Sequence, residues 1–304
     1  DLDIIFYVDT AQEPTTCAVD EFVRQVRIKS DMLPRGIVAI GGGSTLDVGK
    51  AVANLLTNEG NASDYQGWDL VQNPAIYKIG VPTISGTGAE ASRTCVMTNK
   101  LTGLKLGMNS DFTVYNELLL DPDLTKSVSR NQYFYTGMDA YIHCIETLNG
   151  HFRNPVADAL SQKTIELCRD VFLSNDMMSD DAREKLMVAS YLGGSAIGMS
   201  YVGLVHPLSA GLSVVLGTHH CIANCIAMRA MEDFYPSEFS EFWEMANKQG
   251  VEVPIGLTAT LSDKDFENLY NASMVHEKPL FNALGKNFNE ILTPERVREL
   301  FEKM

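Results

Sequence analysis

Two groups of residues in the C-terminal half have the types and spacing to hold a metal ion. Asp139 and His143 are four residues apart, so on a helix both side chains project from one face and could share one ion. Alone, such a pair is more typical of a helix-surface ion pair or a hydrogen-bonded core histidine. Three of the chain's six histidines lie further on: His206, and the pair His219 and His220, which are adjacent to each other. One carboxylate and three imidazoles suit a divalent iron or zinc ion with one position open for substrate.

The positions of proline and glycine indicate that these histidines come from different helices. Pro207 and Gly217 would interrupt a continuous helix through this region. We therefore expect His206 and one of the pair His219 and His220 to come from neighbouring helices. The spacing alone leaves open which of the two is the ligand.

A structural zinc site is a poorer interpretation of the same region. Cys221 and Cys225 follow the histidine pair 219–220 so closely that one tetrahedral ion could not be surrounded unless the helix were broken. His151 and His276 have no candidate partners nearby in the sequence. We assign them surface or packing roles.

A glycine-rich turn in the N-terminal half is suited to binding phosphate. Gly41, Gly42 and Gly43 would permit positive φ angles and let a ligand approach the backbone. Ser44 and Asp47 form an S-x-x-D pattern similar to a capping box, which predicts the start of a helix with free N–H groups for a pyrophosphate. The alternative is an ordinary glycine-rich turn capped by Ser44. The pattern is neither G-x-G-x-x-G nor a Walker motif.

A second turn, residues 82–90, follows another apolar run. Its hydroxyl groups, on Thr83, Ser85 and Thr87, could donate to phosphate or ribose oxygens. The alternative is an ordinary loop at the start of a helix. Two such loops, each following a predicted buried strand, are less readily explained as coincidence than one.

Apolar patterning predicts the elements that position these loops. Short β-type runs at residues 4–8, 36–40 and 79–81 alternate with helical patterns at 21–28 and 47–56. This order predicts parallel βαβ units, which bind ligands at the carboxyl ends of their strands.

The two halves of the chain differ in pattern. We expect an α/β dinucleotide-binding domain with a parallel sheet at residues 1–126, followed by an all-helical metal-binding catalytic domain at 127–304. A domain of the first kind rarely begins directly on an internal strand. We therefore expect a first βα unit to be missing.

Composition restricts the ligand class. The net charge is −15, with 39 acidic residues against 24 Lys and Arg, which argues against nucleic-acid and anionic-membrane partners. No apolar run approaches the roughly 18–20 residues of a membrane span. Six cysteines without a C-x-x-C pair indicate reduced thiols and a cytoplasmic setting. We expect small-molecule ligands.

In this order, the motifs resemble those of the iron-containing (group III) alcohol dehydrogenase family. Residues 41–50 resemble its G-G-G-S-x-x-D-x-x-K loop, residues 82–90 its P-T-x-x-G-T-G-[SA]-E loop, and residues 136–143 its T-G-x-D-A-x-x-H helix. Lys105 falls where the family has a lysine beside the cofactor.

The same resemblance selects one histidine of the adjacent pair. His206 and His220 are separated by 14 residues, as are the last two ligands of the family, and His220 with Asn224 fits its H-x-x-x-N pattern. The resemblance therefore implies a dehydroquinate synthase-like architecture, a divalent iron or zinc ion, NAD or NADP, and a homodimer. It implies Asp139, His143, His206 and His220 as metal ligands that act in catalysis through the metal. The implied cofactor-binding residues are Gly41, Gly42, Gly43, Ser44, Asp47, Thr83, Ser85, Thr87 and Lys105.

Within the family, the sequence resembles enzymes of lipopolysaccharide sugar biosynthesis that act on 3-deoxy-D-manno-octulosonate. This implies oxidation of the terminal C8 alcohol of that sugar acid to an aldehyde, with hydride transfer to NAD(P). A dehydrogenase of a small diol or aldehyde is the nearest alternative. A dehydroquinate synthase-type lyase and a non-enzymatic metal-binding protein are the others. For the substrate carboxylate we consider Arg93, whose alternative role is an ion pair with Glu90 on one helix.

The sequence departs from the family pattern at two places. Many members have a second histidine four residues after the third ligand, where this chain has Ala210, so proton release must use another group or water. The family's Asn-Pro in an upstream loop is Glu13-Pro14 here, which bears on contacts near the cofactor.

Overall fold

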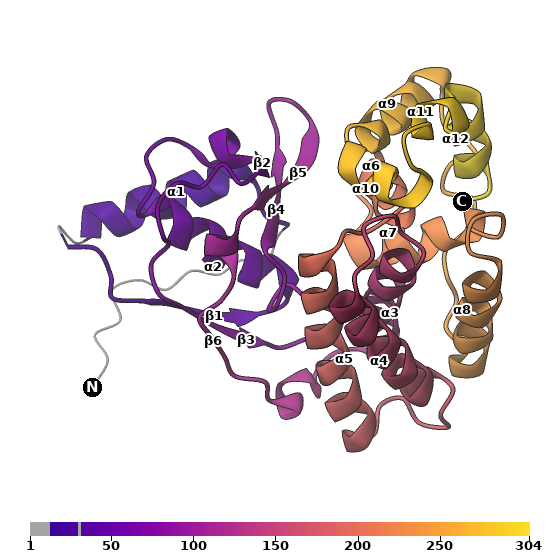
Figure 1. Cartoon of the computed structure of the whole chain (residues 1–304), viewed down its shortest axis with the longest axis horizontal. Helices are drawn as coiled ribbons and strands as arrows, with labels where there is room; N and C mark the ends of the chain where they lie inside the picture. The colour runs from indigo at the N-terminus through magenta and orange to yellow at the C-terminus, as the bar shows by residue number, and fades with distance from the viewer. Residues whose placement is uncertain (1–12, 30–31) are drawn as a thin grey trace. The chain divides into compact units, whose positions relative to one another are not determined.

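The structure, a computed structural model, describes residues 13–29 and 32–304 (Figure 1). The strand expected at residues 4–8 lies outside the described part. Contacts divide the chain into two compact units. The N-terminal unit comprises Asp1–Ile84 and Ala89–Leu124, and the helical unit comprises Ser85–Gly88 and Thr125–Met304. Each unit is described by itself.

A parallel sheet carries the first glycine loop. Strands β1 (Ile37–Gly41), β3 (Lys78–Pro82) and β6 (Glu117–Leu118) lie in the order β1-β3-β6, and all pair in parallel. Helix α2 (Gly43–Leu55) follows β1 directly and packs on β1 and β3. The predicted strands at 36–40 and 79–81, and the parallel α/β class of this unit, are therefore confirmed.

A second small sheet was not predicted. Strand β5 (Leu104–Asn109) pairs antiparallel with β4 (Thr94–Asn99) and parallel with β2 (Gly67–Trp68). The alternative interpretation of residues 82–90 as a loop at the start of a helix is therefore wrong, because β4 follows that loop instead. The β-branched residues in the run Thr-Cys-Val-Met-Thr favour this strand, and Cys95 and Met97 bury the alternate face.

Helices cover the N-terminal unit and complete its core. Helix α1 (Thr16–Lys29) packs on α2 through Val19, Val23 and Val26, which are buried. These valines, the inner face of α2 and the sulfur-containing residues of β4 and β5 form one apolar cluster. Short 3-10 turns occupy Ala62–Tyr65 (η1), Asp111–Thr113 (η2) and Pro122–Thr125 (η3).

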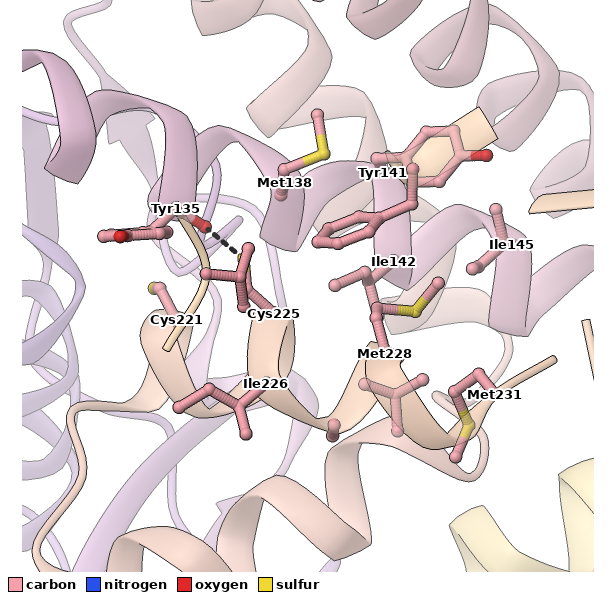
Figure 2. Packing of buried hydrophobic residues seen from close by; sticks show 14 of the residues in the cluster. Tyr135, Met138, Tyr141, Ile142, Ile145, Cys221, Cys225, Ile226, Met228 and Met231 are labelled. Carbon is pink, nitrogen blue, oxygen red and sulfur yellow. Dashed lines mark hydrogen bonds between the residues drawn. The ribbon is translucent and has the colours of Figure 1, made fainter. Parts of the chain in front are cut away.

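The described part of the helical unit contains no strand, as expected from its apolar spacing. Helix α3 is its centre, with every residue from 133 to 147 buried. Figure 2 shows residues of α3, including Tyr141 and Ile142, packed with Ile226 and Met228 from the α7 region. The elements are α3 (Arg130–Leu148), α4 (Pro155–Phe172), α5 (Asp180–Met199), α6 (Val205–Leu216), α7 (His220–Ala227), η4 (Met228–Ala230), α8 (Pro236–Gln249), α9 (Asp263–Met274), α10 (Glu277–Leu284), α11 (Phe288–Ile291) and α12 (Pro294–Glu302).

Local signals explain where several of these helices begin. The side chains of Asn154, Ser179 and Thr293 accept a hydrogen bond from a first-turn N–H of α4, α5 and α12 respectively. Ser262 and Asp265 form a reciprocal capping box at the start of α9. None of the helices among residues 13–29 and 32–304 combines the length and apolar character needed to cross a membrane.

Candidate functional site

Helix α3 presents three ionisable side chains on one buried face. Asp139, His143 and Glu146 are spaced four and three residues apart, which places them along one stripe of the helix. Their exposed fractions are 1%, 3% and 0%. Charged groups are rarely buried to this extent unless they are paired or hold an ion.

Helices α6 and α7 bring two more imidazoles to Asp139. The Nε2 atoms of His206 and His143 lie 3.4 and 3.5 Å from Asp139 Oδ1, and His220 Nε2 lies 3.8 Å from Oδ2. Ligand atoms of Asp139, His206 and His220 all fall within 4.8 Å of one another. The ring of His143 stacks on that of His206 at 4.8 Å. The four residues expected to bind metal therefore converge in the helical unit.

The separations fit a single small ion. Two donor atoms each about 2.1 Å from a tetrahedral ion lie about 3.4 Å apart, close to the observed distances from Asp139. The donors are carboxylate oxygen and imidazole nitrogen, which both Zn²⁺ and Fe²⁺ accept. The distances from Asp139 therefore match those expected between donor atoms that share one divalent ion.

The protonation states of Asp139 and His143 suit metal binding, whereas His206 has to lose a proton first. Burial acts to raise the pKa of Asp139, but its electrostatic interactions with His143 and His220 and its hydrogen bond and charge interaction with His206 outweigh burial and hold that pKa far below its usual value. Burial lowers the pKa of His143 to about 4, which keeps the imidazole neutral. Burial would lower the pKa of His206 as well, but Glu146 and Asp139 reverse this and raise it to about 10 in the metal-free protein. An ion bound here must therefore displace a proton from His206.

Two further side chains support the ligands. Asn224 Nδ2 donates to Asp139 Oδ1 at 2.6 Å and lies 3.4 Å from the Nε2 atoms of both His206 and His220. Glu146 bonds to His206 Nδ1. Asn224 was predicted only as part of a motif. Glu146 was not predicted, although its position seven residues after Asp139 places it on the same helix face.

The adjacent residues His219 and His220 lie in different environments, and two cysteines follow them on α7. His219 is exposed and precedes the first residue of α7, whereas His220 is that first residue and faces Asp139. Cys221 Sγ lies 3.7 Å from Asp139 Oδ2 as a hydrogen-bond donor, and Cys225 Sγ faces the carbonyl oxygen of Tyr135 (Figure 2). The geometry brings His220, and not His219, to the site.

The first glycine loop differs from the sequence expectation in its backbone. Helix α2 begins at Gly43, and Gly42 precedes it with φ −77°, so positive φ is not what these glycines supply. A Cβ at Gly41 would lie 2.5 Å from the Thr45 hydroxyl oxygen, and one at Gly42 would lie 3.2 Å from Ile84. Space for close packing is therefore the reason for glycine here. The N-terminus of α2 remains suited to a phosphate.

The capping box expected at this helix is wrong. Ser44 lies inside α2, and Asp47 accepts a hydrogen bond from the Val96 N–H of β4 at 2.9 Å. Burial raises the pKa of Asp47 to about 6 against the opposing charge of Lys50, 3.9 Å away. Lys50 is fully buried and donates to the carbonyl oxygens of Ser92 and Thr94. Asp47 and Lys50 therefore connect α2 to β4 and to the residues just before it by hydrogen bonds.

The second loop needs its glycines to approach two helices. Gly86 has φ +136°, and a Cβ there would lie 1.7 Å from the Thr136 carbonyl oxygen of α3. Gly88 has φ +61°, and its Cβ would lie 2.5 Å from Gly194 Cα of α5. The Gly88 N–H also donates to Ser190 Oγ. This loop segment is therefore built onto the helical unit.

The predicted donors of that loop take different positions. Thr83 belongs to the N-terminal unit, where its N–H donates to the Gly41 carbonyl oxygen and joins the two expected cofactor loops. Ser85 Oγ is buried with no hydrogen-bond partner in the described part of the chain. Thr87 is half-buried. Their contact with a cofactor stays a prediction.

Lys105 and Arg93 are both held by carboxylates of the N-terminal unit. Lys105, on β5, pairs with Glu13, so the residue that replaces the family's asparagine contacts the lysine expected beside the cofactor. Arg93 Nε donates to Asp111 at 2.9 Å and Nη2 bonds to Asp69. The ion pair expected between Arg93 and Glu90 on one helix is wrong, because residue 93 precedes a strand. Both carboxylate contacts also weaken the expectation that Arg93 receives a substrate carboxylate.

Comparisons with known proteins match both halves of the chain to one enzyme family. The sequence model described as iron-containing alcohol dehydrogenase matches residues 1–122, and the one for the C-terminal part of Fe-containing alcohol dehydrogenases matches residues 133–257. The chain is 34% identical over 191 residues to sulfoacetaldehyde reductase of Bilophila wadsworthia, which covers 62% of this chain and 49% of the relative. It is 33% identical over 244 residues to 4-hydroxybutyrate dehydrogenase of Cupriavidus necator, covering 77% and 63%.

The fold is found in solved structures as well. A sulfoacetaldehyde reductase from Bifidobacterium kashiwanohense, solved in complex with NAD⁺, superposes with a TM-score of 0.78 at 22% identity, covering 96% of this chain and 81% of that one. The chain spans only about half to two thirds of the length of the two curated relatives. The two family matches together extend over most of the chain, and the candidate ligand residues 139, 143, 206 and 220 lie within the second match. The chain belongs to the iron-containing alcohol dehydrogenase family.

Proposed function

We propose that this protein is a metal-dependent oxidoreductase that interconverts a primary alcohol and an aldehyde with NAD or NADP. The observation that carries the proposal is that ligand atoms of Asp139, His206 and His220 lie within 4.8 Å of one another, with His143 Nε2 3.5 Å from Asp139 Oδ1. The glycine loop at the start of α2 supports the proposal that a dinucleotide binds. Family membership supports both the metal ion and the dinucleotide cofactor.

The chain's own residues have separable roles in this chemistry. Asp139 contributes the negative charge, and Asn224 holds its Oδ1 by a 2.6 Å hydrogen bond. His143 is neutral and buried, so its Nε2 is available as a donor atom. When bound, the divalent ion supplies Lewis acidity that lowers the pKa of a substrate hydroxyl, and the nicotinamide supplies the hydride acceptor.

Ala210 cannot take part in releasing the proton of the substrate hydroxyl group. It occupies the position where many family members have a second histidine, and a methyl group cannot accept a proton. The released proton must then be transferred to another side chain or to solvent.

For the substrate, we propose an anion with a terminal primary alcohol or aldehyde. Sequence resemblance supports the C8 alcohol of 3-deoxy-D-manno-octulosonate. The names of two curated relatives, sulfoacetaldehyde reductase and 4-hydroxybutyrate dehydrogenase, instead indicate small anions. Sulfoacetaldehyde carries a sulfonate and 4-hydroxybutyrate a carboxylate. A small acid is therefore the second candidate, and it shares the anionic group and the terminal reacting carbon with the sugar acid.

The test is a direct assay of cofactor reduction. Purified protein loaded with Zn²⁺ or Fe²⁺ receives NAD⁺ or NADP⁺ together with the sugar acid, 4-hydroxybutyrate or the uncharged 1,3-propanediol. We expect metal-dependent reduction of the nicotinamide with an acid substrate, lost in Asp139→Asn and kept in His219→Ala, whose side chain is exposed. Turnover without net reduction would indicate a lyase of the dehydroquinate synthase type. Metal binding without any turnover would favour a non-enzymatic role.

A further inference from the structure

Glu146 makes an unusual set of contacts for a side chain that is not one of the four ligands. Its side chain is fully buried on α3, one turn beyond His143. Oε1 accepts from the N–H groups of Val205 at 2.6 Å and His206 at 3.3 Å, and Oε2 bonds to His206 Nδ1. Burial of a carboxylate is costly, and these three hydrogen bonds offset that cost.

The two backbone contacts fix the start of α6. Leu204 precedes the first residue of this helix and supplies no side-chain cap. The carboxylate of Glu146 takes that role from another helix, because it accepts from the first two N–H groups of α6. Gly203 permits the approach, since a Cβ there would lie 3.2 Å from Glu146 Cβ. The backbone of His206 is therefore tied to the same helix that carries Asp139 and His143.

The ring contact determines which nitrogen of His206 can coordinate. An ionised carboxylate only accepts hydrogen bonds, so Nδ1 must carry a hydrogen. The lone pair of a neutral His206 is then on Nε2, the atom 3.4 Å from Asp139 Oδ1. The carboxylate of Glu146 thus determines both the position of His206 and its tautomer.

We propose that Glu146 is a positioning residue that holds His206 in its Nδ1–H tautomer with Nε2 directed at the ion, and thereby raises the metal affinity of the site. The inference rests on the proposed function, because it assumes the same metal site. Partners of this kind behind a ligating histidine commonly change metal affinity 10- to 100-fold when removed, in order-of-magnitude terms.

The Glu146→Gln variant separates positioning from simple capping. The glutamine oxygen can still accept from the N–H groups of Val205 and His206, but its NH₂ group cannot accept from Nδ1–H. The ring is then driven toward the Nε2–H tautomer, which blocks the coordinating nitrogen. We expect the affinity for Zn²⁺, measured by competition with a chromophoric chelator, to fall about 10- to 100-fold.

Asn282→Ala is the matched control. Asn282 is also fully buried and donates to the carbonyl oxygens of Tyr201 and Val202, in the segment that leads to α6, without contacting the His206 ring. We expect this variant to lose thermal stability while its Zn²⁺ affinity stays within about 3-fold of wild type. Wild-type Zn²⁺ affinity in Glu146→Gln, or an equal loss in both variants, would overturn the proposal.

A measurement on the wild type covers the case in which Glu146→Gln does not fold. Long-range ¹H–¹⁵N correlation spectra of the zinc-loaded protein report which ring nitrogen of each histidine carries hydrogen. We expect Nδ1–H at His206, and hydrogen on Nε2 would overturn the proposal. If the wild type binds Zn²⁺ and Glu146→Gln binds it equally, only this inference fails. A wild type that binds neither Zn²⁺ nor Fe²⁺ overturns the proposed function and this inference together.

Discussion

Replacing Gly88 by alanine tests whether the second loop is held against the helical unit as the structure shows. Gly88 has φ +61°, and an added Cβ would lie 2.5 Å from Gly194 Cα, 2.8 Å from Gly194 N and 3.3 Å from the Ser190 carbonyl oxygen. The left-handed conformation costs a non-glycine residue about 1–2 kcal/mol. Displacing the backbone of α5 adds about 1–3 kcal/mol. We therefore expect Gly88→Ala to reduce the free energy of unfolding by about 2–5 kcal/mol.

Gly250→Ala is the matched control in the same unit. Gly250 has φ +60°, but a Cβ there meets nothing within 4 Å, so only the conformational cost of about 1–2 kcal/mol applies. Urea unfolding followed by circular dichroism measures both variants under the same conditions. If Gly88→Ala is no more destabilising than Gly250→Ala, the close contact between this loop and α5 is refuted.

Two further predictions concern charged residues of the N-terminal unit. Because Arg93 is paired with Asp69 and Asp111, Arg93→Met should lower stability by about 0.5–1 kcal/mol and should change kcat/KM equally for an acid and an uncharged alcohol. A loss confined to the acid would restore Arg93 as the carboxylate site. Burial lowers the pKa of Lys78 to about 8, so the folded state binds this proton less tightly than the unfolded state, and the resulting cost fades as pH rises above 8. Between pH 7 and 10 the wild type should therefore gain about 1–2 kcal/mol of stability more than Lys78→Met in paired urea titrations, and parallel pH profiles would contradict this.

The convergence of the candidate metal ligands could be predicted because local rules determine where their side chains lie. The spacing of Asp139 and His143 fixes a shared helix face wherever the helix packs. The break at Gly217, which takes φ +68°, separates the helices of His206 and His220 as expected. Spacing could not distinguish His219 from His220, because both lie at a helix start and only the packing of α7 decides which faces Asp139.

Other features could not be predicted because they depend on contacts far apart in the sequence. Glu146 gains its importance from the N–H groups of α6, about 60 residues away. Asp47 matches a capping pattern, but its best donor is the Val96 N–H of β4, a strand that the sequence analysis did not predict. The glycines of the second loop are explained only by the backbones of α3 and α5. Backbone groups are partners in each of these cases, and they leave no signature in side-chain type.

Metal content of paired histidine variants tests the central claim most directly. His220 Nε2 lies 3.8 Å from Asp139 Oδ2, whereas its neighbour His219 is exposed, so the two substitutions are matched in chemistry and differ in position. Each protein is loaded with Zn²⁺, dialysed and analysed by plasma mass spectrometry. We predict one equivalent of zinc per chain in the wild type and in His219→Ala, and a near-complete loss in His220→Ala. A full equivalent retained by His220→Ala would contradict the assignment of the metal site.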